Sequence, residues 1–153
     1  MADGATSEWI PIVSGLPQGS VLGPLLFILY TSKMPEPAEN RLYAYADDST
    51  LLAVVCKPAD KPAVAATLNK DLARIQEWCN HWCMMLYPYN IKSLVIVRSR
   101  TVNPSDGALL LYGVSIRVSP NLDILGVKFD SKLNSKTNPP DDVLVLSGGF
   151  HSR

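Results

Sequence analysis

Two adjacent carboxylates, Asp47 and Asp48, lie in the middle of the stretch RLYAYADDSTLLAVV at residues 41–55. The flanks are rich in β-formers, so the stretch predicts a strand, a tight turn and a second strand, with the acids at the turn. Asp is common in turns because its side chain bonds nearby backbone N–H groups, and a plain hairpin tip is the structural explanation. The functional alternative is a carboxylate pair that holds divalent cations, because Mg²⁺ prefers oxygen ligands.

The composition predicts one globular domain. The chain has 153 residues, of which 47% are apolar and 18% charged, enough to bury a core. Fourteen basic and fourteen acidic residues cancel, so the net charge does not indicate a nucleic-acid partner. Cations do gather locally, and either a solvated face or a phosphate-binding strip explains them. They are Lys92, Arg98, Arg100 and Arg117.

Cysteine usage and hydropathy predict an intracellular protein, cytoplasmic or nuclear. The odd count of three cysteines lacks the spacing of a secreted scaffold. A zinc site at Cys79, His81 and Cys83 is disfavoured, because His81 leaves the helix face that the two cysteines share and no fourth ligand is near. No signal peptide is recognisable, and the apolar run at residues 21–30 is too short to span a bilayer.

The order of predicted elements indicates an α+β fold, a sheet with helices on one face. The apolar run at residues 21–30 follows a loop rich in Gly, Pro and Ser and predicts a buried helix. Apolar residues recur every three or four positions over residues 64–84, which predicts an amphipathic helix of about five turns. Further strands are predicted at residues 9–13, 93–97, 108–112, 115–118 and 124–129. Residues 134–153 are predicted to be a disordered tail after a domain over residues 1–133.

Several blocks in order resemble the reverse transcriptase of non-LTR, LINE-type, jockey-like retrotransposons. The first is GLPQGSVLGPLLF at residues 15–27, and the second is Tyr45-Ala46-Asp47-Asp48. The run LNKDL at residues 68–72 and the closing LGVKFD at residues 125–130 are similar to the same family. The resemblance covers about residues 4–133. Either block alone is weak evidence, whereas the ordered set is specific.

The resemblance implies a palm subdomain, an antiparallel sheet that carries the acidic hairpin and has helices packed on one face. In that family Asp47 and Asp48 would help to hold two Mg²⁺ ions for template-directed nucleotidyl transfer. The implied partners are an RNA template, a DNA primer and a deoxynucleoside triphosphate, and no membrane.

The resemblance also assigns substrate-binding roles. Residues Pro17, Gln18 and Gly19 would shape the pocket for the incoming nucleotide and the template base. Residues Tyr45 and Ala46 would bind substrate, with Ala46 at the primer terminus.

Two departures from the family pattern predict that the chain alone has no polymerase activity. The metal site needs a further Asp from a motif before the Pro-Gln-Gly block, and Asp3 and Glu8 do not lie in that context. The fingers, the front of the palm and the thumb are absent as well. The family's catalytic lysine, near the leaving phosphate, aligns with Asn90, and Lys92 is the predicted substitute because it shares a face with Asn90 in an extended strand.

Two other functions stay open at the level of the sequence. In the first, the chain is a domesticated binding module that has kept the sheet and binds nucleic acid through the four cations named above. A translated remnant of a mobile element without a selected role would have the same sequence features.

Overall fold

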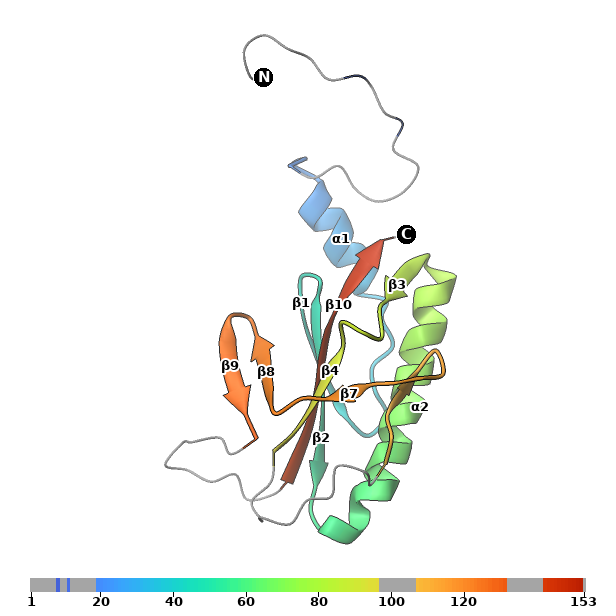
Figure 1. Ribbon diagram of the computed structural model, residues 1–153. Coiled ribbons are helices and arrows are strands. Elements are labelled where there is room, and N and C mark those ends of the chain that lie inside the picture. The colour runs from blue at the N-terminus through green and yellow to red at the C-terminus, as the bar shows by residue number, and fades with distance from the viewer. Residues whose placement is uncertain (1–7, 9–10, 12–18, 97–106, 132–141, 153) are drawn as a thin grey trace.

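The computed structural model describes residues 8, 11, 19–96, 107–131 and 142–152. Figure 1 shows a central twisted sheet, a long helix along one face and a small hairpin across the other. The described helices are α1 (Gly23–Thr31), α2 (Lys61–His81) and the short 3-10 turn η1 (Pro58–Asp60). The described strands are β1 (Arg41–Tyr45), β2 (Asp48–Val55), β3 (Met84–Leu86), β4 (Lys92–Ile96), β5 (Leu110–Leu111), β6 (Val114–Ser115), β7 (Arg117–Val118), β8 (Asn121–Ile124), β9 (Val127–Asp130) and β10 (Asp142–Ser152).

The acidic stretch forms a hairpin at one edge of the main sheet, which confirms the predicted strand, turn and strand. The sheet has the order β1-β2-β10-β4-β7, and β3 pairs with β10 off this path. Every pair in it is antiparallel except β4 and β7, which run parallel. The fully antiparallel sheet of the prediction is therefore wrong in this detail, because the chain crosses over through β5 and β6 before it returns as β7. The α+β class is confirmed, while the palm assignment stays a prediction.

Helix α2 covers one face of the sheet and confirms the predicted amphipathic helix, with both ends three residues earlier. Its apolar stripe packs against Leu51 of β2 and Leu146 of β10. The helix ends at His81 because the chain turns at Cys83, where φ is +54°, and enters β3. This layer holds the larger part of the core. The buried residues that α2 contributes are Ala65, Leu68, Asp71, Leu72, Ile75, Trp78 and Cys79.

The β8–β9 hairpin packs on part of the opposite face, over a second cluster of Leu94, Ile96, Leu122 and Val145. The sequence predicted a single strand over residues 124–129, and this was wrong. Leu125 and Gly126 both have positive φ, +49° and +79°, as in a tight hairpin turn. The apolar run thus contains a turn that its hydropathy does not reveal.

Strand β10 overturns the prediction of a disordered tail for residues 142–152. These residues form the longest strand of the sheet, at its centre between β2 and β4. Its apolar residues alternate between the two cores, and the polar composition of the residues before it concealed this pattern. Residues 132–141 and Arg153 lie outside the described residues, and so does most of the strand predicted at residues 9–13.

Helix α1 forms as predicted, but the expectation that it is buried was wrong. None of its residues is buried, and Leu25 and Ile28 are 55% and 62% exposed. Its only aromatic contacts in the described chain are made by Tyr30, whose ring packs edge-on against Trp78 and Trp82 of the α2 end. Uniformly apolar helices are normally covered on all sides, whereas α1 leaves its large apolar side chains exposed. No helix among the described residues is long and apolar enough to cross a membrane.

Candidate functional site

The acidic turn is a two-residue connection that is strained at Ala46. Tyr45 and Asp48 are paired as the last residues of β1 and the first of β2, which leaves Ala46 and Asp47 as the turn. Ala46 has φ of +50°, whereas Asp47 is not among the positive-φ residues. A positive φ at the first central position alone is typical of a type II′ turn, where glycine is the preferred residue. Non-glycine residues held in this region recur at functional sites, where the surrounding structure fixes them.

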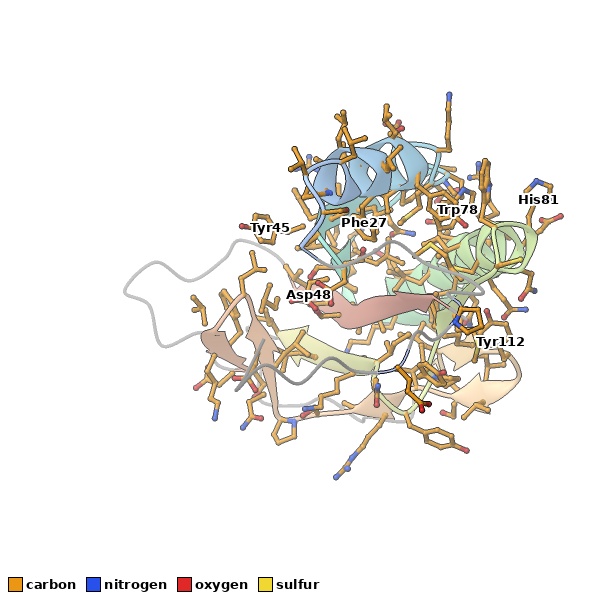
Figure 2. The ribbon with its side chains drawn as sticks, turned by 90° about the horizontal axis from the view of Figure 1, so that it is seen from above. Phe27, Tyr45, Asp48, Trp78, His81 and Tyr112 are labelled. Atoms are coloured by element: carbon orange, nitrogen blue, oxygen red, sulfur yellow. The ribbon has the colours of Figure 1, made fainter. Side chains whose placement is uncertain are left out.

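The register places Asp48 on the face of the sheet that is opposite α2. Leu51 and Ala53 are buried in the cluster beneath α2, and strand alternation therefore puts Asp48 and Thr50 on the other side. Both Asp47 and Asp48 are exposed. Figure 2 shows Asp48 next to β10 and Tyr45 farther out, on the side of α1. The two predicted acids are thus at an open end of the hairpin.

Polar side chains continue from Asp48 across the same face. Thr50 is opposite Ser147, Ser147 is opposite Lys92, and Lys92 is the parallel neighbour of Arg117. The hydroxyls of Thr50 and Ser147 are hydrogen-bonded at 3.3 Å. Lys92 and Arg117 are exposed, and neither makes an ion pair with another described residue. The row is therefore an uncharged pair of hydroxyls beside two neighbouring cations.

Lys92 shares the face of Asp48 without touching it. Strand β10 lies between β2 and β4. Lys92 is level with Thr50, which is two residues along β2 from Asp48. With strands about 4.8 Å apart and about 3.3 Å per residue, the two Cα atoms are separated by roughly 12 Å. A lysine side chain covers about half of that distance, so Lys92 could approach a ligand that extends from Asp48 across the sheet. Arg98 and Arg100 lie outside the described residues.

This face of the sheet is divided into a covered and an open half. The apolar half lies beneath β8 and β9, with Leu52 and Val143 packed against that cluster. The remaining half carries the exposed side chains of Asp48, Lys92 and Arg117, with half-buried Thr50 and buried Ser147 between them. The exposed cations beside an acidic turn can attract an elongated phosphate-bearing ligand.

A buried carboxylate holds the segment that leads into the hairpin. Asp71 of α2 is only 3% exposed, and its Oδ2 accepts a hydrogen bond from the side-chain amide of Asn40 at 2.6 Å. Its Oδ1 accepts one from the backbone N–H of Ala38 at 3.3 Å and lies 3.9 Å from Arg74. Asn40 immediately precedes β1, so α2 fixes where the hairpin begins. This role was not predicted from the sequence, although an acid within the apolar stripe of a helix was a signal for it.

A groove of about 570 Å³ borders the hairpin on the side of α1. Helix α1 contributes Phe27 and Ile28 to its wall, and β1 with the turn contributes Leu42, Tyr43 and Ala46. The predicted pocket residue Gly19 lies just before α1, in a turn with φ of +82° where a Cβ would meet no atom within 4 Å. Position 19 therefore favours glycine because of its positive φ and not because a side chain would lack space. Pro17 and Gln18 lie outside the described residues, so their predicted roles stay predictions.

The end of α1 is tied to the end of α2 by aromatic residues. The Tyr30 hydroxyl donates a hydrogen bond to the carbonyl of Trp82, and the two ring centroids are 5.0 Å apart. Burial, with a smaller effect from Cys83, raises the pKa of Tyr30, so its hydroxyl keeps the proton that it donates. Trp78 is 8% exposed and belongs to the core cluster beneath α2. This contact anchors one wall of the groove.

The residues that the structure describes do not complete a two-ion metal site. Among the described residues, no three His, Cys, Asp or Glu side chains come together. Asp47 and Asp48 supply oxygen ligands of the type that Mg²⁺ prefers, but a hard divalent ion needs about six oxygens and two ions need more carboxylates than two.

Comparison with known proteins identifies the class. The family model described as reverse transcriptase (RNA-dependent DNA polymerase) matches residues 1–129. The chain therefore belongs to the reverse transcriptase family, and the resemblance seen in the sequence is confirmed.

The curated relatives place it among proteins of non-LTR mobile elements. The RNA-directed DNA polymerase from the mobile element jockey of Drosophila melanogaster is 31% identical over 139 residues, covering 86% of this chain. The probable RNA-directed DNA polymerase from transposon BS of the same organism is 30% identical over 130 residues, covering 78% of this chain. The chain spans 14% of the length of each of these relatives. No solved structure gives a significant match.

Proposed function

We propose that this chain supplies part of the nucleotidyl-transfer site of an RNA-directed DNA polymerase from a non-LTR mobile element. The observation that carries the proposal is the exposed Asp47-Asp48 pair at a two-residue turn on a sheet edge. In this proposal the longer protein acts on an RNA template, a DNA primer and a deoxynucleoside triphosphate inside the cell. Because the chain spans 14% of its relatives, the complete activity belongs to that longer protein.

The chain's own residues would orient substrate rather than complete the reaction. Asp47 and Asp48 provide two carboxylates, and Mg²⁺, when held with further ligands from outside the described residues, supplies neutralisation of phosphate charge. Lys92 and Arg117 attract the phosphate backbone over the open half of the sheet. Tyr45 and Ala46 lie at the turn, next to the groove, where they can contact the end of a primer. Pro17, Gln18 and Gly19 would complete the pocket from the loop before α1.

Primer extension tests this proposal. The isolated chain, supplied with an RNA template, a DNA primer, deoxynucleotides and Mg²⁺, is expected to give no product above background. A longer polypeptide that adds the missing carboxylate motif is expected to extend the primer, with a loss of at least a hundredfold in Asp47→Ala. Extension by the isolated chain that disappears in Asp47→Ala would contradict the proposed incompleteness. Extension by the longer polypeptide that survives Asp47→Ala would contradict the assigned site.

A second candidate, a nucleic-acid-binding module, is favoured by the neighbouring cations Lys92 and Arg117 on the open face. Binding through phosphates releases counterions, so affinity falls with salt with a slope of about −0.9 for each contact on duplex DNA. A Lys92→Gln and Arg117→Gln double variant should therefore lower the slope by about 2. The exposed pair Lys57→Gln and Lys70→Gln, away from this face, is the matched control. Absence of binding by the wild-type chain at 50 mM salt excludes the module.

A further inference from the structure

Strand β10 fills a slot between two strands that do not pair with each other in the described chain. Along its length, residues 142–149 pair with β2 and residues 143–147 pair with β4, both antiparallel. Residues 150–152 continue along β3. Figure 1 shows β10 passing through the middle of the molecule between these neighbours. Without β10, the sheet would separate into the β1–β2 hairpin and the β4–β7 pair.

The slot is selective for the sequence that occupies it. Leu146 packs into the cluster beneath α2, and Val145 packs into the cluster beneath β8 and β9. A Cβ at Gly148 would lie 2.5 Å from Cγ1 and 3.4 Å from Cα of Ile91, so only glycine fits there without a shift. Ser147 adds the hydrogen bond to Thr50 at 3.3 Å. The slot therefore favours an occupant with alternating apolar residues and a glycine at the position of Gly148, and a serine before that glycine adds a hydrogen bond.

The family model matches the strands that form the slot but does not match β10, which fills it. Strands β2, β3 and β4 lie within residues 1–129, which match the family model, whereas β10 lies beyond that match. The slot is thus built by the family part of the chain and is filled by sequence outside it. The partners are also distant in sequence, with Thr50 and Ser147 separated by 97 residues. Pairing between residues this far apart in sequence costs closure entropy and slows folding, so the slot is open in any chain whose own β10 has not yet paired.

We propose that the slot is a strand-acceptor site whose partner is β10 of a second copy of this chain, so that two copies exchange their last described strands. Strand β10 of a second copy has the same sequence as the strand it would replace. It would therefore pair in the same register, pack its apolar residues into both clusters and place Gly148 against Ile91. Main-chain pairing supplies affinity in strand addition, and alternate side-chain pockets supply specificity. Exchange of an identical element adds no new contacts and closes a dimer at low energetic cost. The proposal does not depend on the polymerase function.

Cross-linking of mixed full-length chains tests the exchange. One chain carries Thr50→Cys and the other carries Ser147→Cys, both with Cys56→Ser and Cys83→Ser so that the exposed native thiols are absent. The two chains are unfolded together, refolded and oxidised with glutathione disulfide. Exchange predicts a shift from monomer to a covalent dimer, with the disulfide between positions 50 and 147 identified by mass spectrometry. Adding Gly148→Val to the Ser147→Cys chain should reduce the dimer at least tenfold, because the donor strand no longer fits.

A single chain that carries both cysteines is the control for geometry. It should form the 50–147 disulfide within one chain when refolded at high dilution, since the two hydroxyls that the cysteines replace are in contact. If this disulfide forms but the mixed chains give no interchain product, strand exchange is excluded. If the double variant forms no such disulfide, β10 does not occupy the slot in the described register, and the proposal is excluded as well.

Discussion

At the scale of the residue, Ala46 shows how the acidic turn is held. Its φ of +50° places a Cβ where the left-handed region disfavours it. The turn keeps this geometry because β1 and β2 pair on both sides of it, from Tyr45 and Asp48 outward. The backbone that presents the two acids is therefore determined by the strands and not by the preference of the turn residue.

Ala46→Gly should stabilise the chain by about 1 kcal/mol, because relief of the left-handed strain exceeds the added freedom of glycine in the unfolded state. Ala44→Gly, in the extended part of β1, is the matched control and should destabilise by about 1 kcal/mol. Urea unfolding followed by circular dichroism measures both. A loss of stability in Ala46→Gly similar to that of the control would show that the turn is not strained.

Cys79 is the thiol that the fold protects. It is fully buried on α2, while Cys56 and Cys83 are exposed. Burial raises the pKa of Cys79 from 9.0 to about 12. The thiol is therefore neutral and unreactive in the folded chain at physiological pH.

A thiol reagent should accordingly modify two cysteines of the native chain at pH 8 and all three in urea. The raised pKa of Cys79 also makes the free energy of unfolding depend on pH. The unfolded thiol releases its proton near pH 9 and the folded thiol near pH 12. The unfolded state thus binds fewer protons in this range, and the contribution of Cys79 to stability declines as pH rises from 9 to 12. Cys79→Ala should flatten that decline. Rapid modification of all three native thiols would contradict the burial of Cys79.

At the scale of the element, α2 organises its surroundings through side chains that bind backbone groups of loops. Asn69 accepts from Leu110 N–H at 2.8 Å and donates to the Ala108 carbonyl at 3.0 Å, which holds the β5–β6 hairpin. Asp71 holds the segment before β1 in the same way. One helix therefore fixes both the small hairpin and the start of the acidic one.

Asp71→Ala should destabilise the chain by about 2–3 kcal/mol, because it leaves the Asn40 amide and the Ala38 N–H without their buried acceptor. Hydrogen exchange should also accelerate in β1 more than in the interior of α2. Asp123→Ala, at an exposed position of β8, is the control and should change stability by less than about 0.5 kcal/mol. A uniform acceleration over all elements would indicate a global effect in place of local anchoring.

Elements with strong local signals were predictable from the sequence, and their surroundings were not. The spacing of Leu68, Leu72 and Ile75 predicts α2 because helix periodicity is a local property. The apolar run of α1 predicts a helix, but its burial depends on what packs against it, and none of its residues is buried in this chain. The turn at Leu125 and Gly126 was missed because alternation of apolar residues continues across it.

At the scale of the whole molecule, the sheet is assembled from strands far apart in sequence, and this limited the prediction. Neither the central position of β10 nor the proximity of Ser147 and Lys92 to the acidic hairpin has a local signal, because pairing across 97 residues is a tertiary property. The position of Asp47 and Asp48 at the end of a hairpin was predictable, because Asp is common in turns and the flanking residues favour strands. Their role as metal ligands stays a prediction.

Under the proposed function, Asp47 and Asp48 bind a divalent ion with fewer carboxylates than a two-ion site needs. Titration of the isotopically labelled chain with Mn²⁺, monitored by paramagnetic broadening of amide signals, tests it most directly. Broadening is expected to be centred on residues 46–48 and on Gly149 opposite Asp48, with an affinity in the millimolar range because two carboxylates act alone. The Asp47→Asn and Asp48→Asn double variant should abolish it. Broadening centred elsewhere, or micromolar binding of two ions at the hairpin, would show that the hairpin is not a metal site of this kind.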